Sequence, residues 1–146
     1  MVYSFLNVNC TIAGPGGFAN CGAGGAAAEE GITLEASVEK NVMTIGADGK
    51  GQHSLVADNS CKATIRLLKT SPVNAILQIM YDLQSSSSAL WGQNVITVTD
   101  SGRNDLNIVQ SAAFNKKATI TYAKEGGMME WVFDGISLST VLGAGQ

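Results

Sequence analysis

The residue type best suited to acid–base chemistry occurs once in this chain, at His53. A single histidine cannot form a two-histidine metal site, and a serine–histidine–aspartate triad would have to recruit it. The residue lies in the stretch 50–54, beside a predicted turn, and no G-x-S-x-G nucleophile motif accompanies it. We therefore predict no enzyme activity, no catalytic residue, no metal and no cofactor, and interpret His53 as a solvated or interface residue.

Two glycine clusters, Gly14–Gly17 and Gly22–Gly25, could suggest a loop that cradles phosphate. Such a loop needs a strand before it, a helix after it and, in the Walker form, a lysine followed by serine or threonine. Here the following segment is strand-like, no lysine is near, and Pro15 removes a backbone donor. We expect residues 14–31 to be a glycine-rich arm or loop. It is either a flexible linker or, as we favour, an arm that orders against a neighbouring subunit.

Carboxylates gather in the next segment, at Glu29, Glu30, Glu35 and Glu39. Glu35 and Glu39 fall on one face of a predicted strand, about 13 Å apart at the rise of a strand, too far to share a proton. A solvated sheet face is the usual explanation. A channel wall that repels DNA is the functional alternative, and the alternation leaves both open.

The elements that must position these residues are mostly strands, because apolar and polar residues alternate along much of the chain. Asp48-Gly49 and Gly126-Gly127 mark turns between strands. The predicted strands cover residues 6–12, 32–38, 42–45, 61–67, 95–99, 106–114, 118–124 and 129–133.

One helix interrupts this pattern, over about 71–84. Ser71-Pro72 is a typical helix start. The expected apolar face, at helical spacing, comprises Ile76, Ile79, Met80 and Leu83. The fold class we predict is mainly β: two antiparallel sheets, as a sandwich or barrel, with one flanking α-helix, in a single domain over residues 1–146.

Charged residues make up only 14% of the 146 residues, against about 25% in ordinary soluble domains. Their place is taken by small and polar residues, which suits close packing against many neighbours. The net charge is −3, so no basic surface supports tight nucleic-acid binding. We therefore expect the aromatic residues to pack in the core or on the sheets rather than stack on bases; these are Tyr3, Phe5, Trp91, Tyr122, Trp131 and Phe133.

Cysteine use and the N-terminus bear on the compartment. Cys10, Cys21 and Cys61 are odd in number and form no C-x-x-C pair, which favours reduced thiols inside a cell. The first residues read as the start of a strand rather than a secretory leader, and no apolar run approaches the roughly 18 residues of a membrane helix. We expect a protein that is soluble and intracellular when synthesised, without membrane insertion of its own.

Five stretches in this order and spacing resemble a known family, that of the small tail tube proteins of contractile-tailed bacteriophages. No single stretch is diagnostic, and the resemblance spans residues 3–143. They are Ala28–Glu35 (AEEGITLE), Met43–Gly49 (MTIGADG), Arg66–Ala75 (RLLKTSPVNA), Ala89–Val95 (ALWGQNV) and Tyr122–Gly127 (YAKEGG).

The resemblance implies a β-sandwich whose inner strands join those of five other copies into one ring-closed barrel. Rings would stack into a hollow tube that templates the sheath and conducts DNA during ejection. Partners implied are further copies of the chain, the tail sheath protein, the baseplate or tube initiator, the tail terminator and the tape measure protein, with genomic DNA in transit. The location implied is the virion tail, after assembly in the host cytoplasm.

The resemblance also leads us to expect particular residues at the subunit contacts and in the lumen. The helix would pack outside the barrel, and Glu35 and Glu39 would face the lumen. The residues expected to contact the neighbouring ring are Gly14, Pro15, Gly16, Gly17, Phe18, Gly46, Asp48, Gly49, Lys50 and His53.

Three other readings remain open. A small β-sandwich module that binds a ligand such as carbohydrate would stay a monomer or dimer with a concave aromatic site. A small hydrolase would depend on His53. Another virion protein, such as a tail terminator or a head-decoration protein, would form single rings or none.

Overall fold

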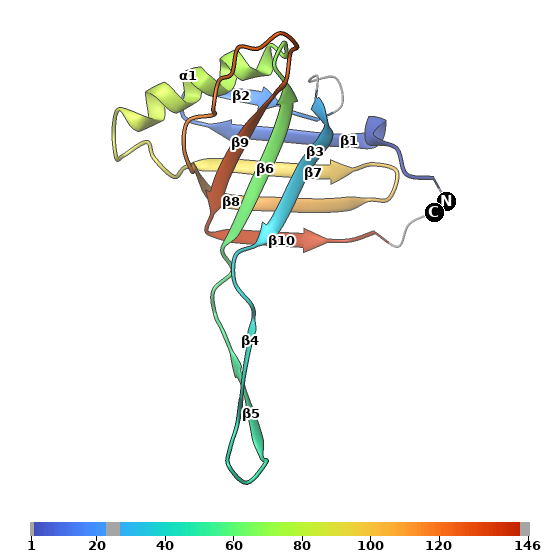
Figure 1. The fold of residues 1–146 in the computed structure, drawn as a ribbon, viewed down its shortest axis with the longest axis vertical. Helices are drawn as coiled ribbons and strands as arrows, with labels where there is room; N and C mark the ends of the chain where they lie inside the picture. The colour runs from blue at the N-terminus through green and yellow to red at the C-terminus, as the bar shows by residue number, and fades with distance from the viewer. Residues whose placement is uncertain (1, 23–26, 144–146) are drawn as a thin grey trace.

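The computed structural model describes residues 2–22 and 27–143 (Figure 1). A short 3-10 turn, η1 (Phe5–Asn7), comes before the first strand, and one helix, α1 (Val73–Ser85), lies mid-chain. The strands are β1 (Val8–Gly14), β2 (Gly17–Asn20), β3 (Ala27–Ala36), β4 (Asn41–Ile45), β5 (Gly51–Leu55), β6 (Cys61–Leu68), β7 (Asn94–Asp100), β8 (Asp105–Phe114), β9 (Met128–Gly135) and β10 (Ser137–Val141).

Eight strands form one antiparallel sheet that folds into two layers. Its order is β2-β1-β7-β8-β9-β6-β3, with β10 also paired to β8, while β4 and β5 pair only with each other. Figure 1 shows β3, β6 and β9 lying across the layer of β1, β7, β8 and β10, with α1 along one end of the body. The mainly β class with one flanking helix is therefore confirmed.

The two layers are joined at a corner where β9 turns into β10. β8 pairs with β10 through its first half and with β9 only at Ala113 and Phe114. Between these halves Ser111 has a φ of 53°, which bends the strand from one partner to the other. Gly135 ends β9 opposite, and a Cβ there would lie 2.2 Å from the Val109 side chain. Only glycine lets the layers approach this closely.

The core lies between the layers and under α1. Trp131 and Phe133 of β9 are fully buried, and the Trp131 indole N–H donates to the Asn74 side chain of α1 over 3.0 Å. The rings of Phe114 and Phe133 stand 4.5 Å apart between centroids. Trp131 and Phe133 thus pack in the core as expected, and Phe5 packs against it. Trp91 is 38% exposed and touches Tyr81 edge-on. The expectation is wrong for Tyr3 and Tyr122, which are 67% and 87% exposed.

The helix forms where the sequence predicts it, but the predicted buried face is largely wrong. Of the expected apolar stripe only Met80 is buried, whereas Ile76, Ile79 and Leu83 are exposed by 37–62%. The face that packs inward instead comprises Val73, Asn74, Leu77, Met80 and Gln84. It includes two amides, because their polar groups find partners in the neighbouring strands and turns.

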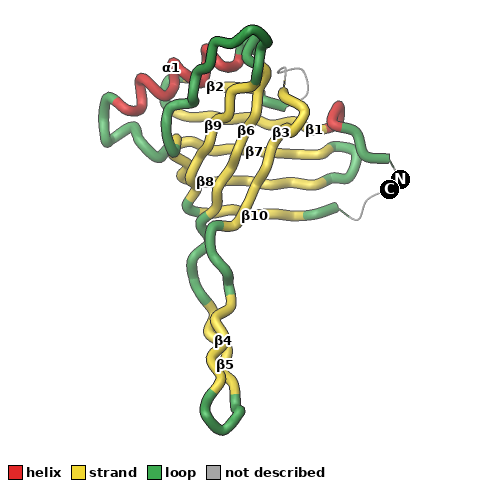
Figure 2. Tube along the Cα trace, viewed as in Figure 1, coloured by secondary structure: helices red, strands yellow, loops and turns green. Residues whose placement is uncertain are grey.

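Three other expectations differ from the structure. Residues 14–31 are not one loop: they contain β2 and the start of β3, while the cluster at 23–26 lies outside the described residues. Residues 118–124 do not form a strand, and Figure 2 shows the whole connection from β8 to β9 as loop. β5 and β10 are strands that the alternation did not reveal.

Candidate assembly surfaces

The β4–β5 hairpin projects far from the body (Figure 1). Every residue of both strands is exposed. Four of them are large and apolar, with exposed fractions from 51% to 86%: Val42, Met43, Ile45 and Leu55. A lone two-stranded hairpin with exposed apolar side chains is at best marginally stable in water, so this one is suited to a partner surface.

Local hydrogen bonds explain why the hairpin forms. At its tip the Gly46 N–H donates to the Lys50 carbonyl over 2.7 Å, and the Lys50 N–H donates to the Asp48 carboxylate over 3.1 Å. Gly49 has a φ of +86°, which glycine adopts without strain. At its base the Lys40 ammonium donates to the Val56 carbonyl over 3.0 Å.

The residues expected at a ring contact therefore divide into two groups. Gly46, Asp48, Gly49 and Lys50 lie together at the tip of this hairpin, and His53 lies opposite Met43 in its strands, exposed to solvent. The Asp48-Gly49 turn is confirmed. An Asp-Gly turn after a strand is typical of a β-hairpin, in which a second strand of similar length follows the turn. This pattern could have predicted β5.

The second group lies elsewhere, in the turn between β1 and β2, which packs on α1. Gly16 has a φ of +94°, and a Cβ there would lie 2.7 Å from Leu83. The Gln84 side chain donates to the Pro15 carbonyl over 2.9 Å. Gly14 and Gly17 also sit in close contact with side chains, whereas Phe18 is 62% exposed.

Behind this turn, two buried amides bind each other. The Gln84 Nε2 donates to Asn94 Oδ1, and Asn94 Nδ2 donates back to Gln84 Oε1, each over 2.8 Å. Both side chains are fully buried. The reciprocal pair satisfies groups that would otherwise be costly to bury, and it links α1, β7 and the β1–β2 turn.

The outward face of β3, β6 and β9 is polar. Arg66 and Glu130 form an ion pair, with 3.3 Å between Nε and Oε2. Lys62 stands opposite Glu35 across the β3–β6 ladder. Glu35 is thus on an exposed sheet face, but β3 ends at Ala36, so Glu39 does not share its strand as the alternation predicted.

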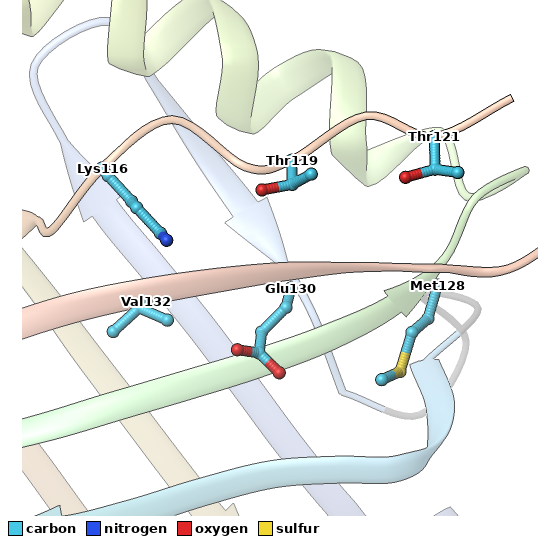
Figure 3. A pocket seen from close by; sticks show the side chains of 6 residues that line it. All are labelled: Lys116, Thr119, Thr121, Met128, Glu130 and Val132. Carbon is cyan, nitrogen blue, oxygen red and sulfur yellow. The ribbon is translucent and has the colours of Figure 1, made fainter.

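A groove runs beside β9, under the connection from β8 (Figure 3). Its volume is about 190 Å³, and its lining is mixed in polarity: Lys116, Thr119, Thr121, Met128, Glu130 and Val132. Among residues 2–22 and 27–143 no cluster of three potential metal ligands occurs.

The three cysteines are buried and free. A hydrogen bond with the Cys10 thiol and burial together raise the pKa of the Cys21 thiol far above its ordinary value. Burial likewise raises the pKa of the Cys61 thiol. Both thiols are therefore protonated and unreactive at neutral pH.

Elsewhere, the Ser60 N–H lowers the pKa of the Asp58 carboxyl by donating to it over 2.7 Å. This group is fully exposed beside the base of the β4–β5 hairpin, where it holds a turn. Within the part of the chain that the structure describes, no helix has the length and apolar character needed to cross a membrane.

Comparison with known proteins decides the family. The bacteriophage PhiTE tail tube protein family matches residues 1–143. The chain belongs to the PhiTE tail tube protein family. It is a structural component of a phage tail rather than an enzyme, as the resemblance in sequence indicated. No curated protein sequence matches it.

Two solved structures share the fold of this tail tube protein. One is the tube-terminating cap of the anti-feeding prophage, with a TM-score of 0.56 and 9% identity, covering 97% of this chain and 93% of that one. The other comes from the baseplate of the same particle, with a TM-score of 0.50 and 7% identity, covering 97% and 95%. At these identities the likeness concerns the fold alone.

Proposed function

We propose that this tail tube protein closes into hexameric rings that stack into a hollow tube, which templates a contractile sheath and conducts DNA during ejection. The observation that carries the proposal, beyond family membership, is the β4–β5 hairpin. Its four large apolar side chains are exposed by 51–86%, and the hairpin projects away from the body of the fold (Figure 1). Seated on the next ring, they would be buried, and the residues Gly46–His53 would lie at the contact between rings.

The β1–β2 turn would take a different part in the same assembly. Gly14–Gly17 are held on α1, so the segment offers a rigid surface rather than a free arm. Phe18, with its exposed ring, would be the residue of this turn that reaches a neighbouring subunit. The helix would then lie on the outside of the tube, toward the sheath.

The polar face of β3, β6 and β9 is the surface best suited to line the bore. Its two basic side chains are matched by acids, Arg66 with Glu130 and Lys62 with Glu35. A wall without surplus positive charge would let DNA pass without binding its phosphates. Glu35 would face the lumen, and Glu39 would lie near its rim.

Electron microscopy of the concentrated protein tests the proposal directly. Hollow stacks of rings are the expected result. Single rings that never stack would instead favour a tail terminator, a function that the likeness to the anti-feeding prophage cap brings into consideration. Protein that stays monomeric at every concentration, and seeds no tube on a preformed tail end, would refute the proposal.

A further inference from the structure

The connection between β8 and β9 has the sequence of a strand without the hydrogen bonds of one. Along residues 118–124, Ala118, Ile120 and Tyr122 alternate with threonines. Ala118 is buried, but Ile120 and Tyr122 are 45% and 87% exposed. Across the described residues, no backbone-to-backbone hydrogen bond joins 116–124 to the rest of the protein.

The adjacent edge of β9 is also unpaired. The Val132 carbonyl points away from β6, since it accepts the Asn115 N–H over 2.8 Å. Backbone groups two residues apart in a strand point to the same side, so those of Glu130 and Met128 also face outward. The groove of Figure 3 separates them from Thr119 and Thr121.

Both ends of the segment are tied down beside this edge. At the first end the Asn115 amide donates to the Asp134 carboxylate over 2.7 Å. At the other, the Lys69 ammonium donates to the Thr121 carbonyl and lies 3.8 Å from the centre of the Tyr122 ring. The segment is therefore held alongside a strand edge, and apart from the Thr121 carbonyl, which binds Lys69, its described backbone groups have no hydrogen-bond partner.

Strand direction indicates how an added strand at 118–124 would change the pairing between subunits. β3 and β9 run the same way, because each pairs antiparallel with β6 between them. A ring of copies related by rotation would thus have to join β9 to the next β3 in parallel. One added strand from 118–124 reverses that junction, and every pair around the ring becomes antiparallel.

Charge also favours β3 of a second copy as the partner. Asp134 of β9 pairs with Lys62 of β6, and Lys62 pairs with Glu35 near the end of β3, so the three residues lie side by side across the sheet. Asn115 binds Asp134 at that same level. In an antiparallel junction, the exposed acids Glu35 and Glu39 would therefore meet the start of the segment, where exposed lysines stand at positions 116 and 117.

We propose that residues 118–124 become a strand on assembly, pairing with β9 of their own subunit and with the β3 edge of the next copy. The inference rests on the proposed ring. It assigns the subunit junction to two named edges and makes the β8–β9 connection an element that orders only when a neighbour arrives. Ile120 and Tyr122, exposed in the single chain, would be covered at this junction.

Hydrogen exchange of free subunits and assembled particles tests this junction. The amides of 118–124, and those amides of 32–36 that point away from β6, should exchange rapidly in the free protein and slow together, by at least about a hundredfold, in the particle. Particles in which 118–124 remains fast would overturn the inference while leaving the tube intact. Protection of 118–124 together with β2 or β10 instead of β3 would overturn the choice of partner.

Two substitutions at one position supply a matched control. Ile120→Pro removes the backbone donor that a ladder needs, whereas Ile120→Val keeps the donor and the strand preference. Because this N–H has no hydrogen-bond partner among the described residues, both variants should fold with parental circular dichroism and melting temperature. The proline variant should lower the assembled fraction by about tenfold or more and the valine variant by less than about twofold.

The outcomes separate the two proposals. A proline variant that folds and assembles as well as the parent refutes the strand at 118–124 but not the tube. Parental protein that forms no ring or tube refutes the proposed function and the junction together. Should the proline variant misfold, Thr121→Pro and the exchange measurement on the parental particle decide the question.

Discussion

Two glycine-bearing turns in this protein resemble each other in sequence but differ in what holds them. The β1–β2 turn lies on α1, with Gly16 against Leu83 and Pro15 bound by the buried Gln84. The β4–β5 turn lies at the end of a projecting hairpin, and nothing stands within 4 Å of a Cβ built on Gly49. In the first, glycine allows close packing; in the second, it only allows the backbone to turn. The β1–β2 turn therefore contributes to the stability of the subunit, whereas the β4–β5 turn is exposed and can contact a partner.

The largest expected effect comes from removing the free hairpin. Replacing residues 42–54 with a short glycine–serine linker should abolish stacking, because it deletes the exposed apolar strands, while the subunit still unfolds at its parental temperature. Sedimentation and negative-stain microscopy measure the first, and circular dichroism measures the second. Replacement of the loop 86–90 by a linker of the same kind is the control. Tubes of normal length from the shortened protein would contradict the division between the two turns.

The packed turn should respond in the opposite way. Gly16→Val adds a branched side chain at a positive φ and against Leu83, so we expect the free energy of unfolding to fall by about 3 kcal/mol. Urea unfolding measures this loss. Gly49→Val is the matched control, since it has the same backbone strain without the clash and lies outside the core. Equal losses in the two variants would show that the contact with α1 contributes nothing.

The amide pair behind the packed turn can be tested separately. Gln84→Ala leaves the buried Asn94 amide without its partner, and we expect a loss of about 2 kcal/mol in the free energy of unfolding. A double variant with Asn94→Ala should lose less than the sum of the single changes, because both partners are then gone. Strict additivity in this cycle would mean that the two amides do not stabilise each other.

The smallest effect concerns pH and the buried thiols of the packed region. The pKa of Cys21 is raised in the fold, so the unfolded chain releases this proton first as pH rises. The associated stability is present below about pH 8.5 and is lost above it, by about 1.4 kcal/mol at pH 9.5. Urea unfolding at pH 7 and pH 9.5 measures the difference. Cys21→Ala should flatten this dependence, and an unchanged slope would contradict it.

Much of this architecture could be predicted from alternation, because buried and exposed positions follow the period of a strand. The face of α1 could not. Ile76 and Ile79 look more apolar than Gln84, yet Gln84 is buried, because Asn94 and Pro15 supply its hydrogen bonds from distant parts of the chain. A single sequence does not reveal such partners, so the helix was predicted correctly and its orientation was not.

The residues expected at a ring contact show the same limit in a different form. Gly14–Gly17 and Gly46–Gly51 read alike, and only the structure separates a turn fixed on α1 from a turn in solvent. The segment 118–124 has the alternation of a strand, but alternation specifies a face and not a partner. Its pairing, if it comes from another copy, depends on a chain that one sequence does not contain.

The glycine corner at 135 gives the folded chain a mechanical property. β9 and β10 are consecutive in the backbone, so a pulling force on β9 is transmitted through covalent bonds to β10. The hydrogen bonds between β10 and β8 then pass the force to β8. A force applied to one layer would therefore reach the other through the backbone, before the side-chain packing between the layers is disrupted. In a tube wall made of such subunits, the inner and outer layers would resist separation because one continuous backbone joins them.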